Sequence, residues 1–365
     1  MSTPPAPVRG RPRAHRCDGV AADARRILDT GLRDLWHPVA PSRQVEREPV
    51  GLSRLGEPLV LWRDAGGRVH ALEDRCPHRG ARLSLGWNLG ERLACRYHGV
   101  EVDRRGIVTA VPAEPDCPMR GTRQLRSYPV REAAGAVFVW FGLDPDAPPA
   151  PLRLPEELTS DAHARFLCVA NWRTGYRYAL DNFMDPAHGA FLHAVSHALG
   201  QGARRADTTL RATPTGLRFD RHHGHGGHFD WVEFGDTHCL WVRLGLPYKR
   251  RYGPGGDFGI VGFFTGIDPQ HCQAYFWRTR KVQGWQRDVW RFLYRNRLEA
   301  LHWAVLEQDR LVLENMPEHA REREFPCRSD GALLRVRRLL LRRARTQACA
   351  RARQGMLQTP PATLA

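Results

Sequence analysis

Two short segments of this chain each pair a cysteine with a histidine. Residues 76–80 read Cys-Pro-His-Arg-Gly, and residues 95–99 read Cys-Arg-Tyr-His-Gly. The spacing between the segments lets two loops approach one metal centre from opposite sides. Two thiolates and two imidazoles suit either a tetrahedral zinc ion or an iron–sulfur cluster.

The two loops closely resemble the signature of Rieske [2Fe–2S] proteins. In that family two cysteines bind one iron and two histidines bind the other, which raises the reduction potential of the cluster. The resemblance implies that Cys76 and Cys95 bind one iron. It implies that His78 and His98 bind the other iron.

The loops are similar to the oxygenase or ferredoxin type of Rieske protein. Respiratory-type Rieske proteins carry a further cysteine in each loop, and these two cysteines form a disulfide. Here Ala81 and Tyr97 stand at those places. A zinc clip made of the same four ligands is the alternative, although C-x-H is a poor spacing for zinc.

A second group of potential metal ligands lies between residues 181 and 193. Asp185 precedes Pro186, a pair typical of a helix start in which the aspartate is the N-cap. Asp185 and His188 are three residues apart and would share a helix face. His188 and His193 are five residues apart, about 140° on a regular helix, so the helix must break or bulge between them if both bind one ion.

A carboxylate ligand is expected from the helical segment at residues 284–316. Asp309 follows Val305 by four residues and precedes Val312 by three, so it lies on the apolar face. A buried carboxylate needs a partner, and a metal ion would neutralise it. Two histidines and one carboxylate with open positions are typical of non-haem Fe(II) oxygenases. An arginine partner for Asp309, or Glu314 in the ligand role, are the alternatives.

The pattern N-x-x-D-x-x-H-x4-H, followed far downstream by an aspartate within a helix, resembles the catalytic domain of Rieske non-haem iron oxygenase α subunits. The resemblance implies that His188, His193 and Asp309 bind a mononuclear Fe(II). It implies that Asp185 connects this iron to a Rieske histidine of a neighbouring subunit, and that Asn182 lies beside the iron.

The resemblance extends over about residues 35–345 and indicates the type with a single kind of subunit. Residues 307–314 look like those of the vanillate and dicamba demethylases and of phthalate-dioxygenase-like enzymes. Gln308 is a small departure, since acidic residues are common at that place.

The expected fold class is α+β. An all-β Rieske domain is expected at residues 33–145, followed at residues 146–355 by a helix-grip (START/Bet v1-like) catalytic domain with an antiparallel sheet and a long helix. Residues 1–32 are basic and expected to be disordered, apart from a short helix from residue 21. Residues 356–365 are expected to form a flexible tail.

Alternating apolar residues and turn signals predict the strands. Three hairpins are predicted in the first domain, at residues 58–74, 100–111 and 128–141. Later strands are predicted at residues 167–173, 217–220, 228–234, 238–244, 258–265 and 272–282. A basic amphipathic helix is predicted at residues 332–353, with Leu333, Val336, Leu340 and Ala344 on one stripe.

Composition narrows the class of protein. The 365 residues are 42% hydrophobic and contain no apolar run long enough to span a bilayer. The N-terminus lacks a signal-peptide h-region and the nine cysteines are scattered, so a cytoplasmic protein with reduced thiols is expected. The net charge of +16 comes mainly from arginine and suits an acidic redox partner. No recognisable nucleic-acid-binding motif accompanies it.

The resemblance implies the terminal oxygenase of a multicomponent Rieske system. Such an enzyme uses O₂ and two electrons to hydroxylate or demethylate an aromatic or hydrophobic small molecule. The chain has no G-x-G-x-x-G after a strand and no plant-type C-x4-C-x2-C set. The NAD(P)H-dependent reductase or ferredoxin is therefore expected on another protein. The family arrangement implies a homotrimer in which clusters and irons meet across subunit interfaces.

Three other functions remain open at this point. A Rieske electron carrier would need only about the first 145 residues. An oxidative cyclase or desaturase of the same family would have identical metal sites. An arginine-rich nucleic-acid binder would bind without iron.

Further histidines, arginines and aromatic residues have alternative roles. His197 is an alternative metal ligand, and a histidine-rich loop could bind zinc or nickel or lie in solvent. Arg243 or Arg278 could meet a substrate carboxylate or lie at the surface. The loop contains His222, His223, His225 and His228, and the candidate pocket walls are Phe263, Phe264, Phe276, Trp277 and Trp303.

Overall fold

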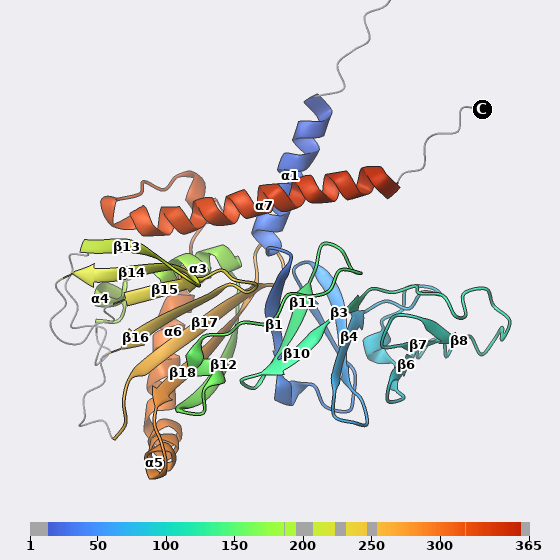
Figure 1. Ribbon diagram of the computed structural model, residues 1–365, viewed down its shortest axis with the longest axis horizontal. Helices are drawn as coiled ribbons and strands as arrows, with labels where there is room; N and C mark the ends of the chain where they lie inside the picture. The colour runs from blue at the N-terminus through green and yellow to red at the C-terminus, as the bar shows by residue number, and fades with distance from the viewer. Residues whose placement is uncertain are drawn as a thin grey trace, which may run out of the picture.

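The computed structural model describes residues 14–185, 187–194, 207–222, 231–246, 254–317 and 319–358. Strands fill the first part of the chain, and a large sheet with helices follows (Figure 1). This order confirms the predicted α+β class, an all-β domain before a catalytic-type domain.

The first domain contains three small antiparallel sheets. The first sheet consists of β1 (Leu35–Pro41), β10 (Val130–Ala133) and β11 (Ala136–Phe141). The second consists of β2 (Val50–Arg54), β3 (Glu57–Arg63), β4 (Val69–Glu73) and β9 (Ser127–Tyr128). The third consists of β5 (Trp87–Asn88), β6 (Arg92–Ala94), β7 (Glu101–Asp103) and β8 (Val108–Ala110). The three predicted hairpins are confirmed as β3–β4, β7–β8 and β10–β11.

A two-residue turn closes the β10–β11 hairpin. Ala133 pairs with Ala136, and the two residues between them, Ala134 and Gly135, have φ values of 50° and 81°. Two successive positive φ angles are typical of a type I′ turn, whose twist matches that of the flanking strands. The turn therefore fixes the register of β11, a strand that is buried along its whole length.

The second domain is built on one antiparallel sheet of seven strands, in the order β12-β18-β17-β16-β15-β14-β13. Its strands are β12 (His163–Trp172), β13 (Asp207–Thr213), β14 (Gly216–His222), β15 (Trp231–Gly235), β16 (Trp241–Leu246), β17 (Phe258–Gly266) and β18 (Cys272–Lys281). A short helix, α2 (Glu156–Thr159), precedes the sheet. Helices α3 (Tyr176–Met184) and α4 (Gly189–Leu192) lie between β12 and β13 in the chain.

One long helical run follows the sheet, as predicted for residues 284–316. It consists of α5 (Trp285–Leu293), a π-helical turn (Tyr294–Leu298) and α6 (Glu299–Glu314). Helices α3 and α6 cover the same face of the sheet, where Phe183 and Leu306 join the core (Figure 1).

Strand β18 is buried on both faces and separates two cores. Phe276 belongs to the core beneath α3 and α6, whereas Trp277, the next residue, belongs to a core shared with the first domain. This alternation follows from the two-residue period of a strand. It means that even-numbered residues of β18 face the helices and odd-numbered residues face the first domain.

The two domains form a continuous interface. The Thr265 hydroxyl donates to the Pro38 carbonyl at 2.8 Å, and the Trp277 indole N–H donates to the Ala134 carbonyl at 2.8 Å. Phe138 of the first domain packs on Phe263 and Trp277 of the second. The hairpin β10–β11 is thereby fixed against the large sheet.

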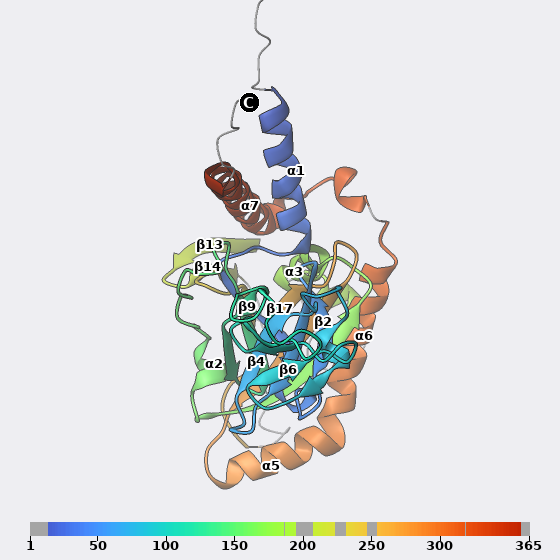
Figure 2. The ribbon, with the colours of Figure 1, turned by 90° about the vertical axis from the view of Figure 1, so that its right-hand side faces the viewer.

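The first and last helices pack against each other. α1 (Ala14–Thr30) and α7 (Gly331–Gln358) lie side by side above the large sheet, and both contribute to its core (Figures 1 and 2). Burial of Val336, Leu340 and Ala344 confirms the predicted apolar stripe of α7. The helix expected from residue 21 instead begins at Ala14, so the expectation of disorder is wrong for residues 14–20, and residues 1–13 lie outside the described part of the chain.

Two further observations concern the described part of the chain. The eight cysteines whose side chains the structure describes, which are all but Cys17, are free thiols. None of its helices combines the length and the apolar character needed to cross a bilayer.

Replacing Trp277 by alanine is expected to destabilise the protein by about 3–5 kcal/mol, because a fully buried indole leaves a cavity between the domains. Trp285→Ala is the matched control, since Trp285 is 68% exposed and its loss should change the stability by less than about 0.5 kcal/mol. Chemical denaturation of both variants measures the difference. Equal losses would contradict the packing described for β18.

Candidate metal centres

The two cysteine–histidine loops have the same backbone hydrogen bonds. The Cys76 amide donates to the Ala81 carbonyl at 2.7 Å, and the Gly80 amide donates to the Cys76 carbonyl at 2.9 Å. In the second loop the Cys95 amide donates to the Val100 carbonyl at 2.8 Å, and the Gly99 amide donates to the Cys95 carbonyl at 2.9 Å. The loops are therefore structural repeats, although their cysteine–histidine spacings differ.

A glycine ends each loop for the same reason. Gly80 has a φ of 76° and Gly99 a φ of 71°, values that most other residues adopt only with strain. These turns direct the chain into the next segment while the preceding side chains remain at the tip. The glycine five residues into each motif is therefore part of the ligand geometry.

The two cysteines and the two histidines of the loops lie in different environments. Cys76 and Cys95 are 2% and 1% exposed and belong to one apolar core, and their thiols lie within hydrogen-bonding reach of each other. His78 is exposed and His98 half-buried, with ring centroids 4.7 Å apart. Pairing thiol with thiol and imidazole with imidazole suits a two-iron cluster in which each iron takes one kind of ligand.

Electrostatics at the loops favour binding of a cation. Burial, together with the neighbouring Cys95 thiol, raises the pKa of the Cys76 thiol to about 11. A bound metal stabilises the thiolate that this environment otherwise disfavours. Partial desolvation and the nearby His78 and Arg79 lower the pKa of His98, so its imidazole is neutral, as a metal ligand must be.

The second group of ligands converges as predicted. His188 immediately precedes the four-residue helix α4 and His193 immediately follows it, so no regular helix splays the two rings. The Nε2 atoms of His188 and His193 lie 3.6 and 3.3 Å from Oδ1 of Asp309. One ligand atom from each residue falls within a group no more than 4.8 Å across. The set of donors fits a divalent iron with open positions.

The other ring nitrogens are held by oxygen acceptors. Nδ1 of His188 lies 2.7 Å from the Asp185 carbonyl, and Nδ1 of His193 lies 2.8 Å from Oε1 of Gln308. Each Nδ1–H therefore donates, which leaves Nε2 free to bind a metal. Sequence reasoning identified Gln308 only as a departure from the usual acidic residue, and its position beside Asp309 was the one signal of this role.

Asp309 is 4% exposed and lies on α6 in the same stripe as Leu306 and Leu313. The Asn182 amide donates to its Oδ1 at 3.1 Å, which confirms that Asn182 lies beside the ligand group. Burial opposes protonation of His193, but hydrogen bonds and charge from Asp309 outweigh it and raise the pKa of His193. The local field thus already favours positive charge at this point.

The two alternatives for the carboxylate ligand are not supported by the geometry. Among the described residues, no arginine forms an ion pair with Asp309. Glu314 accepts from the Arg173 amide at 2.9 Å and from Arg310 at 3.2 Å, on the opposite side of the helix end. Its carboxylate is therefore engaged away from the histidines.

The prediction that Asp185 is an N-cap is wrong. Asp185 is the C-cap of α3, and its Oδ1 accepts from the Ala187 amide at 2.7 Å, which bends the chain between α3 and α4. The N-cap of α4 is His188, and it makes no side-chain cap bond. The Asp185 side chain is 37% exposed, so its carboxylate faces the surface beside His188.

The remaining histidine predictions lie largely outside the described residues. His197, His223, His225 and His228 are in segments that the structure does not describe. The backbone of His222 ends β14. Arg243 pairs with Glu233 at 2.8 Å and with Glu157 at 3.1 Å, whereas Arg278 is buried and forms no ion pair among the described residues.

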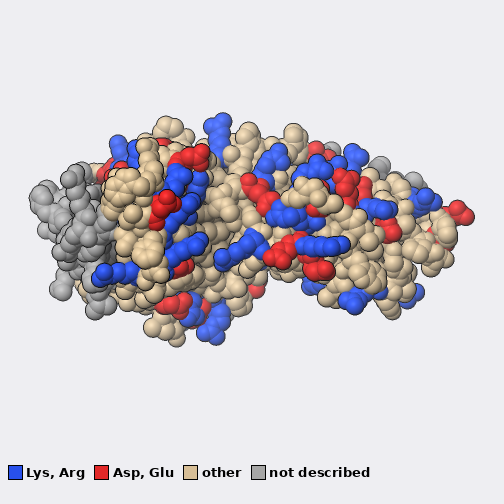
Figure 3. Space-filling view, turned by 90° about the horizontal axis from the view of Figure 1, so that it is seen from below, with Lys and Arg blue, Asp and Glu red and all other residues tan. Residues whose placement is uncertain are grey.

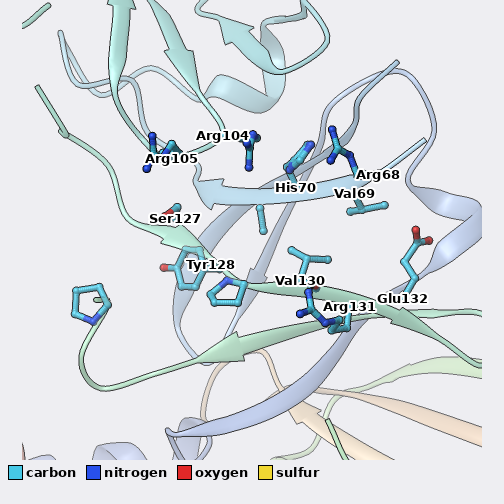
Figure 4. Close-up of a pocket in the computed structure, with 13 residues that line it drawn as sticks. Arg68, Val69, His70, Arg104, Arg105, Ser127, Tyr128, Val130, Arg131 and Glu132 are labelled. Carbon is cyan, nitrogen blue, oxygen red and sulfur yellow. Dashed lines mark hydrogen bonds between the residues drawn. The ribbon is translucent and has the colours of Figure 1, made fainter. Parts of the chain in front are cut away.

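A basic hollow lies on the first domain, apart from both ligand groups (Figure 4). It has a volume of about 510 Å³, and its arginines come from the β3–β4 turn, the β7–β8 turn and β10. Arg68 pairs with Asp64 and Glu91, whereas Arg105 and Arg131 have no acidic partner among the described residues. Elsewhere, on the face shown in Figure 3, basic and acidic side chains are interspersed.

Two family models match the chain. Residues 35–129 match the Rieske [2Fe-2S] domain, and residues 172–346 match the vanillate O-demethylase oxygenase C-terminal domain. The first matched segment contains both cysteine–histidine loops. The second contains all three converging ligands.

Curated relatives match part of the chain. The vanillate O-demethylase oxygenase subunit of Pseudomonas sp. (strain HR199 / DSM 7063) is 34% identical over 45% of this chain and 46% of its own length. The 3-chlorobenzoate-3,4-dioxygenase oxygenase subunit of Comamonas testosteroni is 32% identical over 44% of this chain and 38% of its own length. The matches thus span less than half of these relatives.

Solved structures share the fold over most of the chain. Dicamba monooxygenase bound to dicamba has a TM-score of 0.71 at 21% identity, covering 88% of this chain and 99% of that one. The oxygenase–ferredoxin complex of carbazole 1,9a-dioxygenase has a TM-score of 0.71 at 19% identity, covering 90% and 94%. The two family matches show a Rieske [2Fe–2S] domain followed by an oxygenase C-terminal domain of the vanillate O-demethylase type, and the solved oxygenase structures share this two-domain fold.

Proposed function

We propose that this protein is the terminal oxygenase of a multicomponent Rieske system. One observation carries the proposal. A single chain places two cysteine–histidine loops on the first domain and the group of His188, His193 and Asp309 on the second. A Rieske electron carrier has no need of the second group.

The residues have distinct roles in this proposal. Cys76 and Cys95 hold one iron of the cluster and His78 and His98 the other, while a mononuclear Fe(II) is held by the three converging residues of the second domain. When bound, the cluster supplies electrons singly and the Fe(II) supplies the open positions at which O₂ reacts.

The surrounding side chains keep the second site ordered and dry. Asp185 and Gln308 hold the two imidazoles in the metal-binding tautomer, and Asn182 donates to the carboxylate of Asp309. Next to Asn182, Phe183 packs on Phe264 and Phe276 at centroid distances of 5.6 and 5.1 Å. These rings exclude water and offer an apolar wall to an aromatic or hydrophobic substrate.

The reaction class is hydroxylation of the substrate with O₂. Hydroxylation of an O- or N-methyl group releases that group, so demethylation belongs to the same chemistry. The relatives include a demethylase and dioxygenases, and both outcomes fit the site. Oxidative cyclisation or desaturation at the same iron is the second candidate, because it needs the same ligands.

The electrons come from a separate NAD(P)H-dependent reductase or ferredoxin. The complexes of carbazole 1,9a-dioxygenase show such a ferredoxin on a related fold. In this chain the basic hollow offers a complementary surface to an acidic donor. Strand β4, which lines the hollow, leads directly to the Cys76 loop. Free thiols in the described part of the chain suit a cytoplasmic location.

A homotrimer is the proposed active assembly. Exposed apolar side chains lie in the second loop and in the segment that joins the two loops, with Tyr97 62%, Leu85 65% and Trp87 49% exposed. Tyr97 stacks on His98 at 3.8 Å between centroids. An exposed apolar patch of this kind suits a subunit interface. Docking this tip beside the exposed carboxylate of Asp185 would connect the cluster of one subunit to the iron of the next.

The activity test uses purified protein with a surrogate ferredoxin and reductase. Substrate-dependent consumption of NADH and O₂, with an oxygenated or demethylated product, supports the proposal. Aromatic acids and methyl ethers are the first compounds to screen. Full electron transfer to the cluster with no O₂ consumption for any compound would favour an electron carrier instead.

Asp309→Asn is expected to weaken the affinity for the mononuclear iron by roughly 10- to 100-fold, because it removes the anionic ligand. The variant should therefore lose this iron and its turnover. The Rieske absorption spectrum should stay unchanged. Glu314→Gln is the matched control and should retain iron, because Glu314 pairs with Arg173 and Arg310. Iron analysis of the two variants identifies which carboxylate binds the mononuclear iron. Loss of iron in the Glu314 variant alone would assign the ligand role to Glu314 instead of Asp309.

Asp185→Asn is expected to leave both metal contents intact and to slow turnover by about 10- to 100-fold, since the carboxylate connects the centres across subunits. Stopped-flow oxidation of the reduced cluster in the presence of substrate and O₂ measures this step. Unchanged cluster oxidation would contradict the connecting role. Loss of iron would show a purely structural one.

Arg105→Glu combined with Arg131→Glu is expected to raise the Michaelis constant for an acidic ferredoxin by roughly tenfold at low ionic strength, through charge repulsion. The effect should shrink as salt is added. Arg342→Glu is the control, because Arg342 is exposed on α7. Equal effects of the two substitutions, or none, would refute docking at the hollow.

A further inference from the structure

Helix α3 lies between the C-terminal helix α7 and helix α6, which carries Asp309 (Figures 1 and 2). Two adjacent residues of α3 connect it to these neighbours. Asn182 donates to Asp309, whereas Asp181 forms ion pairs with arginines that follow α6 in the chain. Asp181 is charged and only 9% exposed, yet it belongs to neither group of candidate ligands.

Two arginines from the C-terminal part of the chain hold the carboxylate of Asp181. Nε and Nη2 of Arg337, on α7, donate to its Oδ2 at 2.9 and 2.7 Å. Arg321, in a 3₁₀ turn (Ala320–Glu322), forms an ion pair with the same oxygen. The side chains of Asp181 and Arg337 are 12% and 18% exposed, so solvent screens this pair less than a pair at the surface. Two N–H groups of one guanidinium also fix the direction of the contact.

The last turn of α3 carries hydrogen bonds to two of the candidate iron ligands. The Asp181 carbonyl accepts from the Asp185 amide at 3.1 Å, and the Asp185 carbonyl accepts from Nδ1 of His188 at 2.7 Å. Asn182, the residue after Asp181, donates to Oδ1 of Asp309 at 3.1 Å. The orientation of this turn therefore sets both of these hydrogen bonds.

Helix α3 needs contacts with its neighbours to keep that orientation. It has nine residues, and an isolated helix of this length is not stable in water. Phe183 and Met184 hold it on the core, but apolar packing is not directional.

A small rotation of α3 would be enough to disturb the ligands. Side chains extend roughly 5–6 Å from a helix axis, so a rotation of about 10° moves their ends by about 1 Å. A shift of this size would take the 3.1 Å contact between Asn182 and Asp309 out of hydrogen-bonding range. The directional ion pairs of Asp181 oppose such a rotation.

The other ion pairs of α7 lead elsewhere. Arg343 pairs at 2.9 Å with Asp236, the residue after β15, and Arg351 lies 3.6 Å from Asp23 of α1. These contacts attach α7 to the sheet and to α1. Among the described residues, Arg337 is the arginine of α7 that forms an ion pair with α3.

We propose that Asp181, held by Arg337 and Arg321, is a positioning residue for the mononuclear iron site. It acts through Asn182 and through the carbonyl of Asp185, and it touches neither the metal nor the substrate. The C-terminal helix thereby determines how tightly the second domain binds iron. This inference rests on the proposed function, because it concerns the iron site on which that function depends.

The test uses the full chain with its cluster, loaded with Fe(II) in the absence of O₂ and reductase. Equilibrium dialysis measures the affinity for Fe(II), and EPR spectroscopy of the nitric oxide adduct reports the geometry of the iron. Arg337→Gln and Asp181→Asn should each weaken Fe(II) binding by roughly tenfold, as expected for groups that orient ligands. Both should change the spectrum in the same way as Asn182→Ala. Arg337→Lys keeps the charge and should restore most of the affinity.

Arg343→Gln is the matched control, because it removes an ion pair of the same helix that leads to Asp236 instead of α3. It should leave the Fe(II) affinity and the spectrum unchanged. Thermal denaturation identifies the variants that fold. Arg337→Gln decides the question if Asp181→Asn does not fold, because it leaves Asp181 paired with Arg321.

Wild-type affinity and a wild-type spectrum in folded Arg337→Gln protein would overturn the proposal. An equal loss of affinity in Arg343→Gln would also overturn it, because that loss would show a general loosening of α7. Iron binding that depends on Asp181, in a protein that oxidises no compound, would refute the proposed function alone. An active oxygenase whose iron is insensitive to these substitutions would refute this inference alone.

Discussion

The burial of one carboxylate organises the catalytic half of this protein. Asp309 lies on the inner face of α6, in one stripe with the buried Leu306 and Leu313, and is only 4% exposed. A carboxylate in that position requires positive charge nearby. His188 and His193 are brought beside it by a break between α3 and α4, and an Fe(II) held by the three residues would complete the neutralisation. Helix α6, the sheet beneath it and the bent segment between α3 and α4 together position these three side chains.

The first domain positions its candidate ligands on two loops instead of on helices. Its ligand loops repeat one hydrogen-bond pattern, and each ends at a glycine with positive φ. The cysteines lie in an apolar core, while the histidines lie at the tip. A cluster held this way is rigid on its inner side and accessible on its outer side. Electrons would enter and leave such a cluster through its histidine edge.

Much of this organisation could be predicted from the sequence, because local patterns determine it. Cysteine–histidine spacing and the hydrophobic period of residues 284–316 identified residues that the fold brings together, including Asp309. The role of Asp185 as a C-cap was missed, because Asp-Pro predicts a helix start and the chain instead bends there. The packing of α1 on α7 joins the two ends of the chain, and no local pattern reveals such a contact.

The side chains that escaped prediction act through tertiary contacts. Gln308 is recognisable only once its amide is seen to meet His193, and Arg278 only once its guanidinium is seen to be buried without an anion. Arg243 and Arg278 are equivalent in sequence terms, since both lie in predicted strands. Their difference arises from which neighbouring strands place carboxylates beside them.

The central claim is that one chain carries two separate iron centres of different kinds. Iron and acid-labile sulfide, counted together in protein purified and reconstituted without oxygen, test it most directly. About three irons and two sulfides per chain are expected. Substitution of Cys76 or Cys95 should remove the two sulfides and two of the irons. A colourless protein that binds zinc and retains no sulfide after reconstitution would contradict it.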